Sequence, residues 1–338
     1  MLVLVVDDSA VVRETVSAIL RHERIQVMVA RDPIVARQRI AEARPDVIIL
    51  DLEMPRMDGL TFLRHQMRVD PIPVVVCSAL TGEGTRAALD ALEEGAVAII
   101  TKPQLDVRGF LSDSAVTLVE TVRNAARSGA RRRLPQGVVP RPLPRIASTT
   151  DKIVAVGAST GGTEALRLFL GAMPGDCPGI VVVQHMPEHF TAAFAKRLDT
   201  ECGIAVKEAE SGDRVVSGRA LIAPGNRHTR VHRSGAQYFV EVTDGPLVSR
   251  HRPSVDVLFS SVALAAASNA VGVILTGMGE DGAKGLLELR AAGAHTIAQD
   301  EASCVVFGMP REAILLGAAA EVLALDRIAA HVLRATAA

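Results

Sequence analysis

The sequence predicts two α/β domains joined by a linker: a flavodoxin-like domain of five strand–helix units over residues 1–122, a linker over 123–150, and a second domain over 151–338. Apolar runs of about five residues recur between amphipathic stretches, as parallel strands buried on both faces do. An Arg- and Pro-rich stretch without apolar periodicity separates two such series. In the second series, shorter runs with turn signals predict antiparallel hairpins inserted into a doubly wound, mostly parallel sheet.

The first domain has one predicted strand for each of its apolar, β-branched runs. They are "LVLVV" (2–6), "IQVMVA" (25–30), "DVIIL" (46–50), "PVVVC" (73–77) and "AVAII" (96–100). A last helix is expected near 104–126, and the chain then enters "RNAARSGARRRLPQGVVPRPLPRIASTT" (123–150). The prolines of this stretch predict a partly extended linker, and its arginines are typical of a solvated basic segment.

The second domain begins with a new alternation of apolar and amphipathic stretches at Ile153. Between 203 and 243, the turn signals "SGDRV", "APGNRH" and "RSGAQY" mark the expected hairpins. The strands of the parallel sheet are predicted at 153–157, 179–184, 271–276 and 294–298.

Composition and charge exclude several classes of protein. A net charge of −1 provides no global field for nucleic acid or an anionic membrane. No apolar run approaches the roughly 18 residues of a membrane span, and the start "MLVLVVDDSA" lacks the basic n-region of a secretory signal. Four scattered cysteines without a C-x-x-C pair fit thiols in a reducing compartment. We therefore expect a cytoplasmic protein with no nucleic-acid partner and no direct membrane insertion.

Polar residues follow four of the five strands predicted in the first domain. Asp7 and Asp8 follow the first strand and Asp51 follows the third, and the carboxyl ends of parallel strands meet at one sheet edge. Three converging carboxylates repel each other unless a cation lies between them, and Mg²⁺ suits such oxygen ligands. Ser78 and Lys102 would complete a pocket for a phosphoryl group carried by one carboxylate. Each residue alone has an ordinary explanation, such as a helix N-cap, but the combination favours the site.

The first domain resembles the receiver domains of response regulators. The motifs "VVDDSA", "LDLEMPRMDGL", "CSAL" and "TKP" carry the resemblance, which covers residues 1–104. It implies that a partner histidine kinase phosphorylates Asp51. It also implies a role for the surrounding residues: Asp7, Asp8, Asp51 and the backbone carbonyl of Glu53 hold Mg²⁺, while Ser78 and Lys102 contact the phosphoryl group.

One position departs from the receiver pattern. Receivers often carry an aromatic switch residue three positions before the lysine, where this sequence has Ile99. The resemblance therefore supports phosphorylation at Asp51 without supporting an aromatic-rotamer switch.

The stretch "IVAVGASTGG" (153–162) that opens the second domain has two interpretations. Its glycines could let the backbone approach a dinucleotide pyrophosphate at a helix N-terminus. That interpretation needs an acidic residue at the end of the next strand, but this strand ends in Gln184 and His185, and the glycine spacing is not G-x-G-x-x-G. The alternative is a nucleophile turn, because "GASTG" fits the G-x-S-x-G pattern around Ser159.

A serine nucleophile needs a base, and the base needs an orienting acid. His185 lies at the end of the neighbouring strand, and the strand predicted at 271–276 leads into "GMGEDGAKG", which contains Glu280 and Asp281. Three strand ends thus present Ser, His and an acid at one sheet edge, with Asp281 favoured and Glu280 as its competitor. The order Ser–His–Asp differs from the Ser–Asp–His order of α/β-hydrolases, which indicates a separate hydrolase fold.

The glycines of "TGMGEDG" permit a tight turn whose amides could stabilise an oxyanion. Met278 is the candidate donor in this turn, and Thr160, next to the serine, is the second candidate. No cofactor is expected in this site.

The second domain resembles the catalytic domain of the chemotaxis protein-glutamate methylesterases. The likeness runs from about 152 to 334 and rests on "VAVGASTGGTEAL", "VVQHMPEHFTAAFAKRL", "IAPGNRH", "HRPSVDVLF" and "ILTGMGEDGAKGL". It implies a triad of Ser159, His185 and Asp281. It also implies demethylation of glutamate methyl esters and deamidation of glutamines on methyl-accepting chemotaxis receptors, with phosphorylation of the first domain as the switch.

Two other functions remain open from the sequence. The chain could be a phosphorylation-gated binding module with little catalytic activity, although all three triad residues are present. It could also be the same esterase acting on a receptor array outside chemotaxis, because no residue identifies the receptor. A DNA-binding output is disfavoured, since the second half shows no basic recognition helix.

Overall fold

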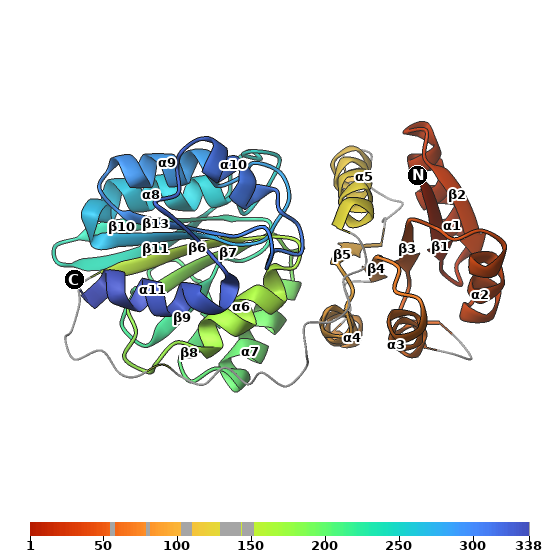
Figure 1. Ribbon diagram of the computed structural model, residues 1–338, viewed down its shortest axis with the longest axis horizontal. Coiled ribbons are helices and arrows are strands. Elements are labelled where there is room, and N and C mark those ends of the chain that lie inside the picture. The colour runs from red at the N-terminus through yellow and green to blue at the C-terminus, as the bar shows by residue number, and fades with distance from the viewer. Residues whose placement is uncertain (55–57, 79–81, 103–109, 129–142, 144–151, 338) are drawn as a thin grey trace. The chain divides into compact units, whose positions relative to one another are not determined.

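The computed structural model describes residues 1–54, 58–78, 82–102, 110–128, 143 and 152–337. The chain divides into two compact units, Met1–Gln136 and Gly137–Ala338, each of which has its own sheet (Figure 1). The last helix of the first unit continues to Ser128 and so overlaps the start of the linker predicted at 123–150. Val122 and Ala125 are buried in the core of that unit, which explains why the helix continues there. The rest of the predicted linker, except Leu143, lies outside the described residues.

The N-terminal unit is a five-stranded parallel sheet in the order β2-β1-β3-β4-β5. All five strands that the apolar runs predict are present, within two residues of the expected bounds. The elements are β1 (Leu2–Val6), α1 (Ala10–His22), β2 (Gln26–Ala30), α2 (Pro33–Glu42), β3 (Val47–Leu50), α3 (Gly59–Val69), β4 (Val74–Ser78), α4 (Gly82–Glu93), β5 (Ala98–Thr101) and α5 (Phe110–Ser128).

Alternate residues of these strands face opposite layers of helices. Val3 and Val5 of β1 belong to a core that α1 and α5 close with residues such as Leu20 and Val119. Helices α3 and α4 contact each other in the other layer, where Phe62 is fully buried. The strands are therefore buried on both faces, which leaves their carboxyl ends as the accessible edge for a site.

The C-terminal unit is built around a seven-stranded parallel sheet in the order β14-β13-β12-β6-β7-β9-β8. The first elements are β6 (Ile153–Ala158), α6 (Gly162–Gly171), β7 (Gly179–Gln184), α7 (Phe190–Glu201), β8 (Ala205–Glu208), β9 (Arg219–Ile222), β10 (His228–Ser234) and β11 (Gln237–Thr243). They are followed by α8 (Val255–Ala266), the 3₁₀ turn η1 (Ala267–Asn269), β12 (Ala270–Ile274), α9 (Ala283–Ala291), β13 (His295–Gln299), α10 (Met309–Leu315), β14 (Glu321–Leu323) and α11 (Leu325–Ala337).

The region of the expected hairpins differs in detail from the prediction. Only β10 and β11 form an antiparallel hairpin, and they make a separate two-stranded sheet rather than joining the large one. Val231 and Val240 of the hairpin are buried in the core with Leu258 of α8, so its apolar face is covered by a helix. The segment before it contributes β8 and β9, which pair in parallel with each other, and β9 pairs in parallel with β7. Helix α7 returns the chain between β7 and β8, as a parallel connection requires.

The helices of the C-terminal unit form one layer on each face of the large sheet. Figure 1 shows α8, α9 and α10 on one face and α6, α7 and α11 on the other. The carboxyl ends of β6, β7 and β12, which are adjacent in the sheet, therefore open onto the same edge.

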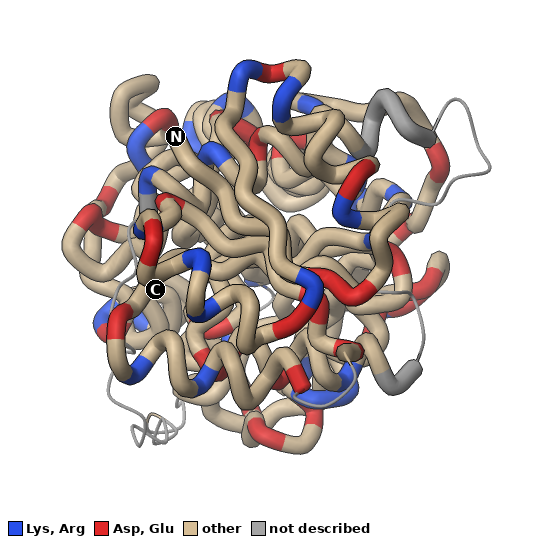
Figure 2. The backbone as a smooth tube through the Cα atoms, turned by 90° about the vertical axis from the view of Figure 1, so that its right-hand side faces the viewer, with Lys and Arg blue, Asp and Glu red and all other residues tan. Residues whose placement is uncertain are grey.

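Charged residues of both signs are interspersed along the described chain. Figure 2 shows Lys and Arg in blue and Asp and Glu in red, interspersed along the tube. Among the described residues, no helix combines the length and the apolar character needed to cross a bilayer.

Candidate active site and acidic receiver site

The acidic site of the N-terminal unit lies at the carboxyl edge of its sheet. Ligand oxygens of Asp7, Asp8 and Asp51 all lie within 4.8 Å of one another. The Lys102 ammonium lies 2.7 Å from Oδ2 of Asp51 and 3.2 Å from Oδ2 of Asp7. Ser78, fully buried at the end of β4, donates a hydrogen bond of 3.2 Å to the Gly84 carbonyl. The structure thus brings the predicted acidic residues and the lysine together.

Electrostatics at this site favour a bound cation. Burial raises the pKa of Asp51 to about 6, and the Asp7 charge adds to this, although Lys102 opposes both. Oδ2 of Asp7 is buried and makes no hydrogen bond within the described part of the chain, although the Lys102 ammonium lies 3.2 Å away. An oxygen of this kind fits a hard cation, so the donor set suits Mg²⁺. The local backbone supports the arrangement, because Arg13 donates to the carbonyls of Asp7 at 2.7 Å and Asp8 at 3.0 Å.

Two backbone features position Asp51 itself. The Glu53 amide donates to Oδ1 of Asp51 at 3.1 Å, which holds the turn that contains the Glu53 carbonyl. A Cβ atom at Gly59 would lie 2.2 Å from the Asp51 carbonyl, so only glycine lets α3 approach the Asp51 backbone this closely. Ile99 lies in β5, which is separated from β3 by β4, and its side chain is half-buried.

In the C-terminal unit, Ser159 lies in the turn between β6 and α6. Its amide donates to the Thr276 carbonyl at 3.0 Å, and its own carbonyl accepts from the Gly162 amide at 2.7 Å. Gly161 has a φ of 76°, in the left-handed region, and a Cβ there would collide with Val305. The glycines of the opening motif therefore permit a tight turn that presents the serine at the sheet edge.

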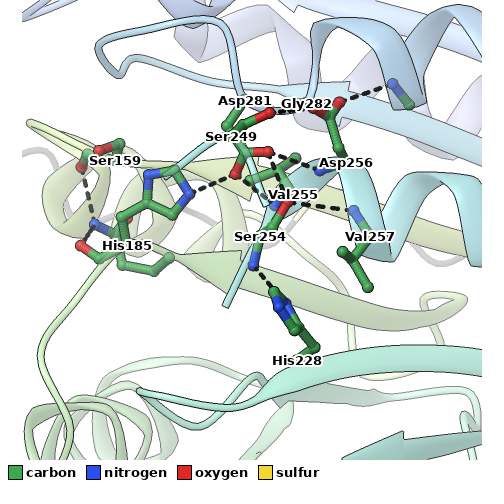
Figure 3. A network of polar contacts seen from close by, with 12 residues as sticks. Ser159, His185, His228, Ser249, Ser254, Val255, Asp256, Val257, Asp281 and Gly282 are labelled. Carbon is green, nitrogen blue, oxygen red and sulfur yellow. Dashed lines mark hydrogen bonds and ion pairs between the residues drawn. The ribbon is translucent and has the colours of Figure 1, made fainter. Parts of the chain in front are cut away.

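His185 follows β7 and is fixed beside the serine turn. Its amide donates to the Ala158 carbonyl at 3.0 Å. The buried amide of Gln184 bridges the two loops, since its Nε2 donates to the carbonyls of Ser159 at 2.9 Å and His185 at 3.1 Å. Figure 3 shows the His185 ring between Ser159 and Asp281, with Nε2 of the ring 2.8 Å from Oδ2 of Asp281.

Asp281 is the acid that contacts the histidine, whereas Glu280 is exposed. Asp281 is fully buried at the N-terminus of α8, where it accepts hydrogen bonds from the Ser254 hydroxyl at 2.7 Å and from the amides of Val255 at 2.7 Å and Asp256 at 3.1 Å. Burial alone would raise its pKa, but these bonds and the contact with His185 outweigh it and lower the pKa to about 2. Asp281 is therefore ionised at neutral pH.

The ionised carboxylate fixes which ring nitrogen of His185 carries the proton. A carboxylate only accepts, so Nε2 must donate and Nδ1 of the neutral ring keeps its lone pair. Nδ1 is buried and has no hydrogen-bond partner among the described residues. The Nδ1 lone pair lies on the side of Ser159, where a general base would accept the serine proton. A hydrogen bond between nucleophile and base is often long in the absence of substrate.

Several supporting residues were not identified from the sequence. The His228 ring is buried and accepts a hydrogen bond from the Ser254 amide at 3.3 Å, while its other nitrogen contacts the Pro246 carbonyl at 2.9 Å. It thereby positions the N-cap residue of α8, whose hydroxyl binds Asp281. No local sequence pattern indicates this role, because His228 and Ser254 lie 26 residues apart in the chain.

Asp256 makes the complementary contact at the next helix. Its Oδ1 accepts from the amides of Gly282 at 2.9 Å and Gly285 at 2.8 Å, at the start of α9. The N-terminus of α9 thus receives a carboxylate from α8, and the N-terminus of α8 receives one from the turn before α9 (Figure 3), where the helix dipoles favour negative charge. The signal was present in "HRPSVDVLF", since Ser254 and Asp256 are typical N-cap and first-turn residues.

The oxyanion candidates lie beside the serine. A Cβ at Gly277 would lie 2.7 Å from the Ser159 Cβ, so the turn that contains Met278 packs directly against the turn that contains Ser159. Within the described part of the chain, the amides of Thr160 and Met278 donate to no backbone carbonyl. Two such amides next to a serine could donate to a developing oxyanion.

His251 stacks on His185, with ring centroids 3.7 Å apart. Because the ring of His251 is buried, the stability of the folded protein should depend on pH through this residue. Burial lowers the pKa of His251 to about 3 from 6.5, with the neighbouring charges of His185 and Arg250 acting in the same direction and Asp281 opposing them. Between these two values the unfolded chain binds a proton that the folded chain does not, so stability falls as the pH falls.

We therefore expect His251→Phe to lose less thermal stability than the native protein between about pH 7 and about pH 5. Calorimetric unfolding of the C-terminal unit measures this difference. His232→Phe is the matched control, because His232 is exposed, and it should keep the native loss. Equal losses for native protein and His251→Phe would contradict the prediction.

A parallel five-stranded domain with an acidic edge, followed by an α/β unit that presents Ser159, His185 and Asp281 at one edge, defines a response regulator with an enzymatic output domain. The CheB methylesterase family model matches residues 154–332, and the response regulator receiver domain model matches residues 3–108. The chain belongs to the CheB methylesterase family and carries a receiver domain. The fold class and the enzyme class predicted from the sequence are confirmed.

Relatives of similar length support this assignment. The chain is 59% identical to protein-glutamate methylesterase/protein-glutamine glutaminase 1 of Anaeromyxobacter dehalogenans (strain 2CP-C) over 342 residues, covering 98% of each chain. It is 57% identical to protein-glutamate methylesterase/protein-glutamine glutaminase 3 of Geobacter metallireducens, covering 98% of each. The crystal structure of the Thermotoga maritima CheB methylesterase catalytic domain covers 54% of this chain and 97% of its own, with 40% identity and a TM-score of 0.53.

Proposed function

We propose that the protein demethylates glutamate methyl esters, and deamidates glutamines, on methyl-accepting chemotaxis receptors when its receiver domain is phosphorylated. The observation that carries the proposal is the 2.8 Å contact between His185 Nε2 and Asp281, which leaves the other ring nitrogen free on the side of Ser159. This arrangement suits acyl transfer, and both reactions are acyl transfers through a serine acyl-enzyme.

The proposed reaction proceeds in two halves. His185 Nδ1 takes the Ser159 proton as the serine oxygen attacks the ester carbonyl, and Asp281 stabilises the resulting imidazolium. The imidazolium returns the proton to the departing methoxide, which leaves as methanol. Water then attacks the acyl-enzyme by the same route and releases the glutamate carboxylate, regenerating Ser159. For a glutamine substrate, the leaving group is ammonia.

Stabilisation of the oxyanion is assigned to the amides of Thr160 and Met278. Their positions in two turns that pack together at Gly277 would let both reach one oxygen. Removal of one such donor typically costs about 10²- to 10³-fold in kcat.

In the receiver, we propose that Asp51 accepts a phosphoryl group from a chemotaxis histidine kinase. Asp7, Asp8, Asp51 and the Glu53 carbonyl would hold Mg²⁺, which supplies positive charge for the transferring phosphoryl oxygens. Lys102 already pairs with Asp51 and would remain beside the phosphoryl group, with Ser78 as the second contact. Phosphorylation then shifts the population of domain arrangements toward one with an open catalytic edge, through the segment predicted as a linker.

The compartment follows from the partners. The methylated region of such receptors and the kinase are cytoplasmic in this proposal, and the four cysteines are free thiols in the structure. We therefore propose that the protein works in the cytoplasm.

The test is methanol release from methyl-labelled receptor membranes, with and without a small-molecule phosphodonor. Native protein is expected to release methanol faster with phosphodonor, whereas Asp51→Asn keeps its basal rate and does not respond. An equal rate of methanol release with and without phosphodonor would support the esterase activity and contradict its control by phosphorylation. No release from chemotaxis receptors would favour the binding-module alternative, and release only from another receptor array would change the substrate.

Mg²⁺ is expected to raise the melting temperature of the unphosphorylated receiver domain, because a cation that binds only the folded carboxylates stabilises by mass action. At tenfold excess over Kd the gain is about 1.4 kcal/mol. Calorimetry with and without Mg²⁺ measures this shift, and Asp8→Ala should abolish it. Glu14→Gln, an exposed neighbour on α1, is the control that should retain it. An equal shift in native protein and Asp8→Ala would remove Asp8 from the ligand set.

A further inference from the structure

A second histidine, His251, covers the ring of the proposed catalytic base. The two rings are 3.7 Å apart between centroids and only 12° from parallel. His251 thus contacts the face of the His185 ring, while Nε2 at the ring edge lies 2.8 Å from Oδ2 of Asp281. The triad does not require this histidine, so its position needs a separate explanation.

The backbone that presents His251 adopts an uncommon conformation. Val248 and His251 exchange two backbone hydrogen bonds, of 2.9 and 3.1 Å, across a tight turn. The two residues between them, Ser249 and Arg250, have φ values of 49° and 66°, in the left-handed region that non-glycine residues rarely adopt. Strain of this kind persists only where surrounding contacts determine it, and it concentrates at functional sites.

Contacts on both sides hold this turn in place. The Ser249 hydroxyl donates to Oδ2 of Asp256 at 3.0 Å, and Oδ1 of the same carboxylate binds the Gly282 amide next to Asp281. On the other side, the Arg252 guanidinium donates to Oδ1 of Asn226 at 3.1 Å and to the Gly245 carbonyl. The turn and the acid of the triad are therefore fixed to the same carboxylate, Asp256.

We propose that His251 is a positioning residue, whose neutral ring holds His185 in the plane that pairs with Asp281 and stabilises its protonated form during catalysis. This inference rests on the function proposed above. Burial keeps the ring of His251 uncharged at neutral pH. An uncharged aromatic face attracts the cation that forms when His185 accepts the serine proton, so the contact is stronger in the transition state than in the resting enzyme.

The stack also restricts rotation of His185. The base touches Asp281 through one ring nitrogen, and that single contact leaves the ring free to tilt about the Nε2–Oδ2 direction. A parallel ring at 3.7 Å removes this freedom and keeps Nδ1 directed toward Ser159. The expected consequence is an effect on kcat rather than on substrate binding.

The test compares His251→Ala and His251→Phe with native protein in methanol release from receptor membranes. His251→Ala is expected to lower kcat about tenfold with KM within about twofold, in line with the strength of cation–π and stacked aromatic pairs. His251→Phe keeps an aromatic face and should recover kcat to within about threefold of native. His232→Ala, an exposed histidine in β10, should match native protein.

A spectroscopic measurement distinguishes this inference from the catalytic proposal. The proton on His185 Nε2 bonded to Asp281 should give a downfield ¹H NMR signal that native protein and His251→Phe share and that broadens or disappears in His251→Ala. Native kcat in His251→Ala, or equal losses in both variants, would overturn the positioning role. A rise in KM alone would also overturn it and assign His251 to substrate contact. If Ser159→Ala retains hydrolysis, the catalytic proposal fails, while the NMR comparison still reports the stack.

Discussion

Ser159→Ala is expected to abolish methyl-ester hydrolysis, with kcat falling by about 10⁵- to 10⁶-fold, as removal of a triad serine does in other hydrolases. The turn is held by backbone hydrogen bonds of Ser159 to Thr276 and Gly162, which do not depend on the hydroxyl. The free energy of unfolding should therefore change by no more than about 0.5 kcal/mol. Methanol release and thermal unfolding, measured on the same preparation, separate lost chemistry from lost structure.

Phosphorylation provides the internal control for this variant. Asp51 belongs to a different compact unit, so Ser159→Ala should accept a phosphoryl group at the native rate. Ser234→Ala, an exposed serine in the hairpin, should hydrolyse at the native rate. Substantial hydrolysis by Ser159→Ala would contradict the role of Ser159 as nucleophile and therefore the proposed catalytic triad.

Asp281→Asn is expected to lower kcat by about 10⁴-fold, through the tautomer of His185. Four donors converge on the two carboxylate oxygens: the Ser254 hydroxyl, the amides of Val255 and Asp256, and Nε2 of His185. An asparagine has one side-chain oxygen and one NH₂ group. In either orientation, its NH₂ group occupies the place of a carboxylate oxygen and faces donors that it cannot accept from. If the NH₂ group faces His185, the ring must carry its proton on Nδ1, which can then no longer receive the serine proton.

The same substitution should also reduce stability, because at least one buried donor loses its acceptor, at a cost of about 1–3 kcal/mol. Kinetic and thermal measurements on Asp281→Asn and on Glu280→Gln test the assignment together. Glu280 is exposed and should tolerate the change in both measurements. The reverse outcome, loss of activity in Glu280→Gln and retention in Asp281→Asn, would show that Glu280 and not Asp281 orients His185.

Much of this protein is determined by the local sequence. Parallel strands buried on both faces require continuous apolar runs, so "LVLVV", "DVIIL" and "PVVVC" locate β1, β3 and β4 without tertiary information. Because chemistry collects at the carboxyl ends of such strands, the residues after them, including Asp51, Lys102, Ser159 and His185, could be selected before any fold was known.

The hairpin region shows where local signals become insufficient. Turn residues between 203 and 243 predict short strands, but β8 and β9 join the large sheet in parallel while β10 and β11 form a sheet of their own. Pairing depends on which surface covers each strand, and the helix that covers the hairpin, α8, lies outside the stretch that carries the turn signals.

The tertiary structure decided the details that give the site its chemistry. Glu280 and Asp281 are adjacent and chemically alike, and only their contacts separate them: the carboxylate of Asp281 meets a histidine 96 residues away and the N-terminus of α8. The same contacts fix the His185 tautomer, and the turn at Ser249 and Arg250 brings His251 onto its ring. The sequence by itself determined which residue types reach the sheet edge, because periodicity and strand ends are local. Which of them touch, and through which atoms, was decided by packing between segments distant in the chain, which no local pattern records.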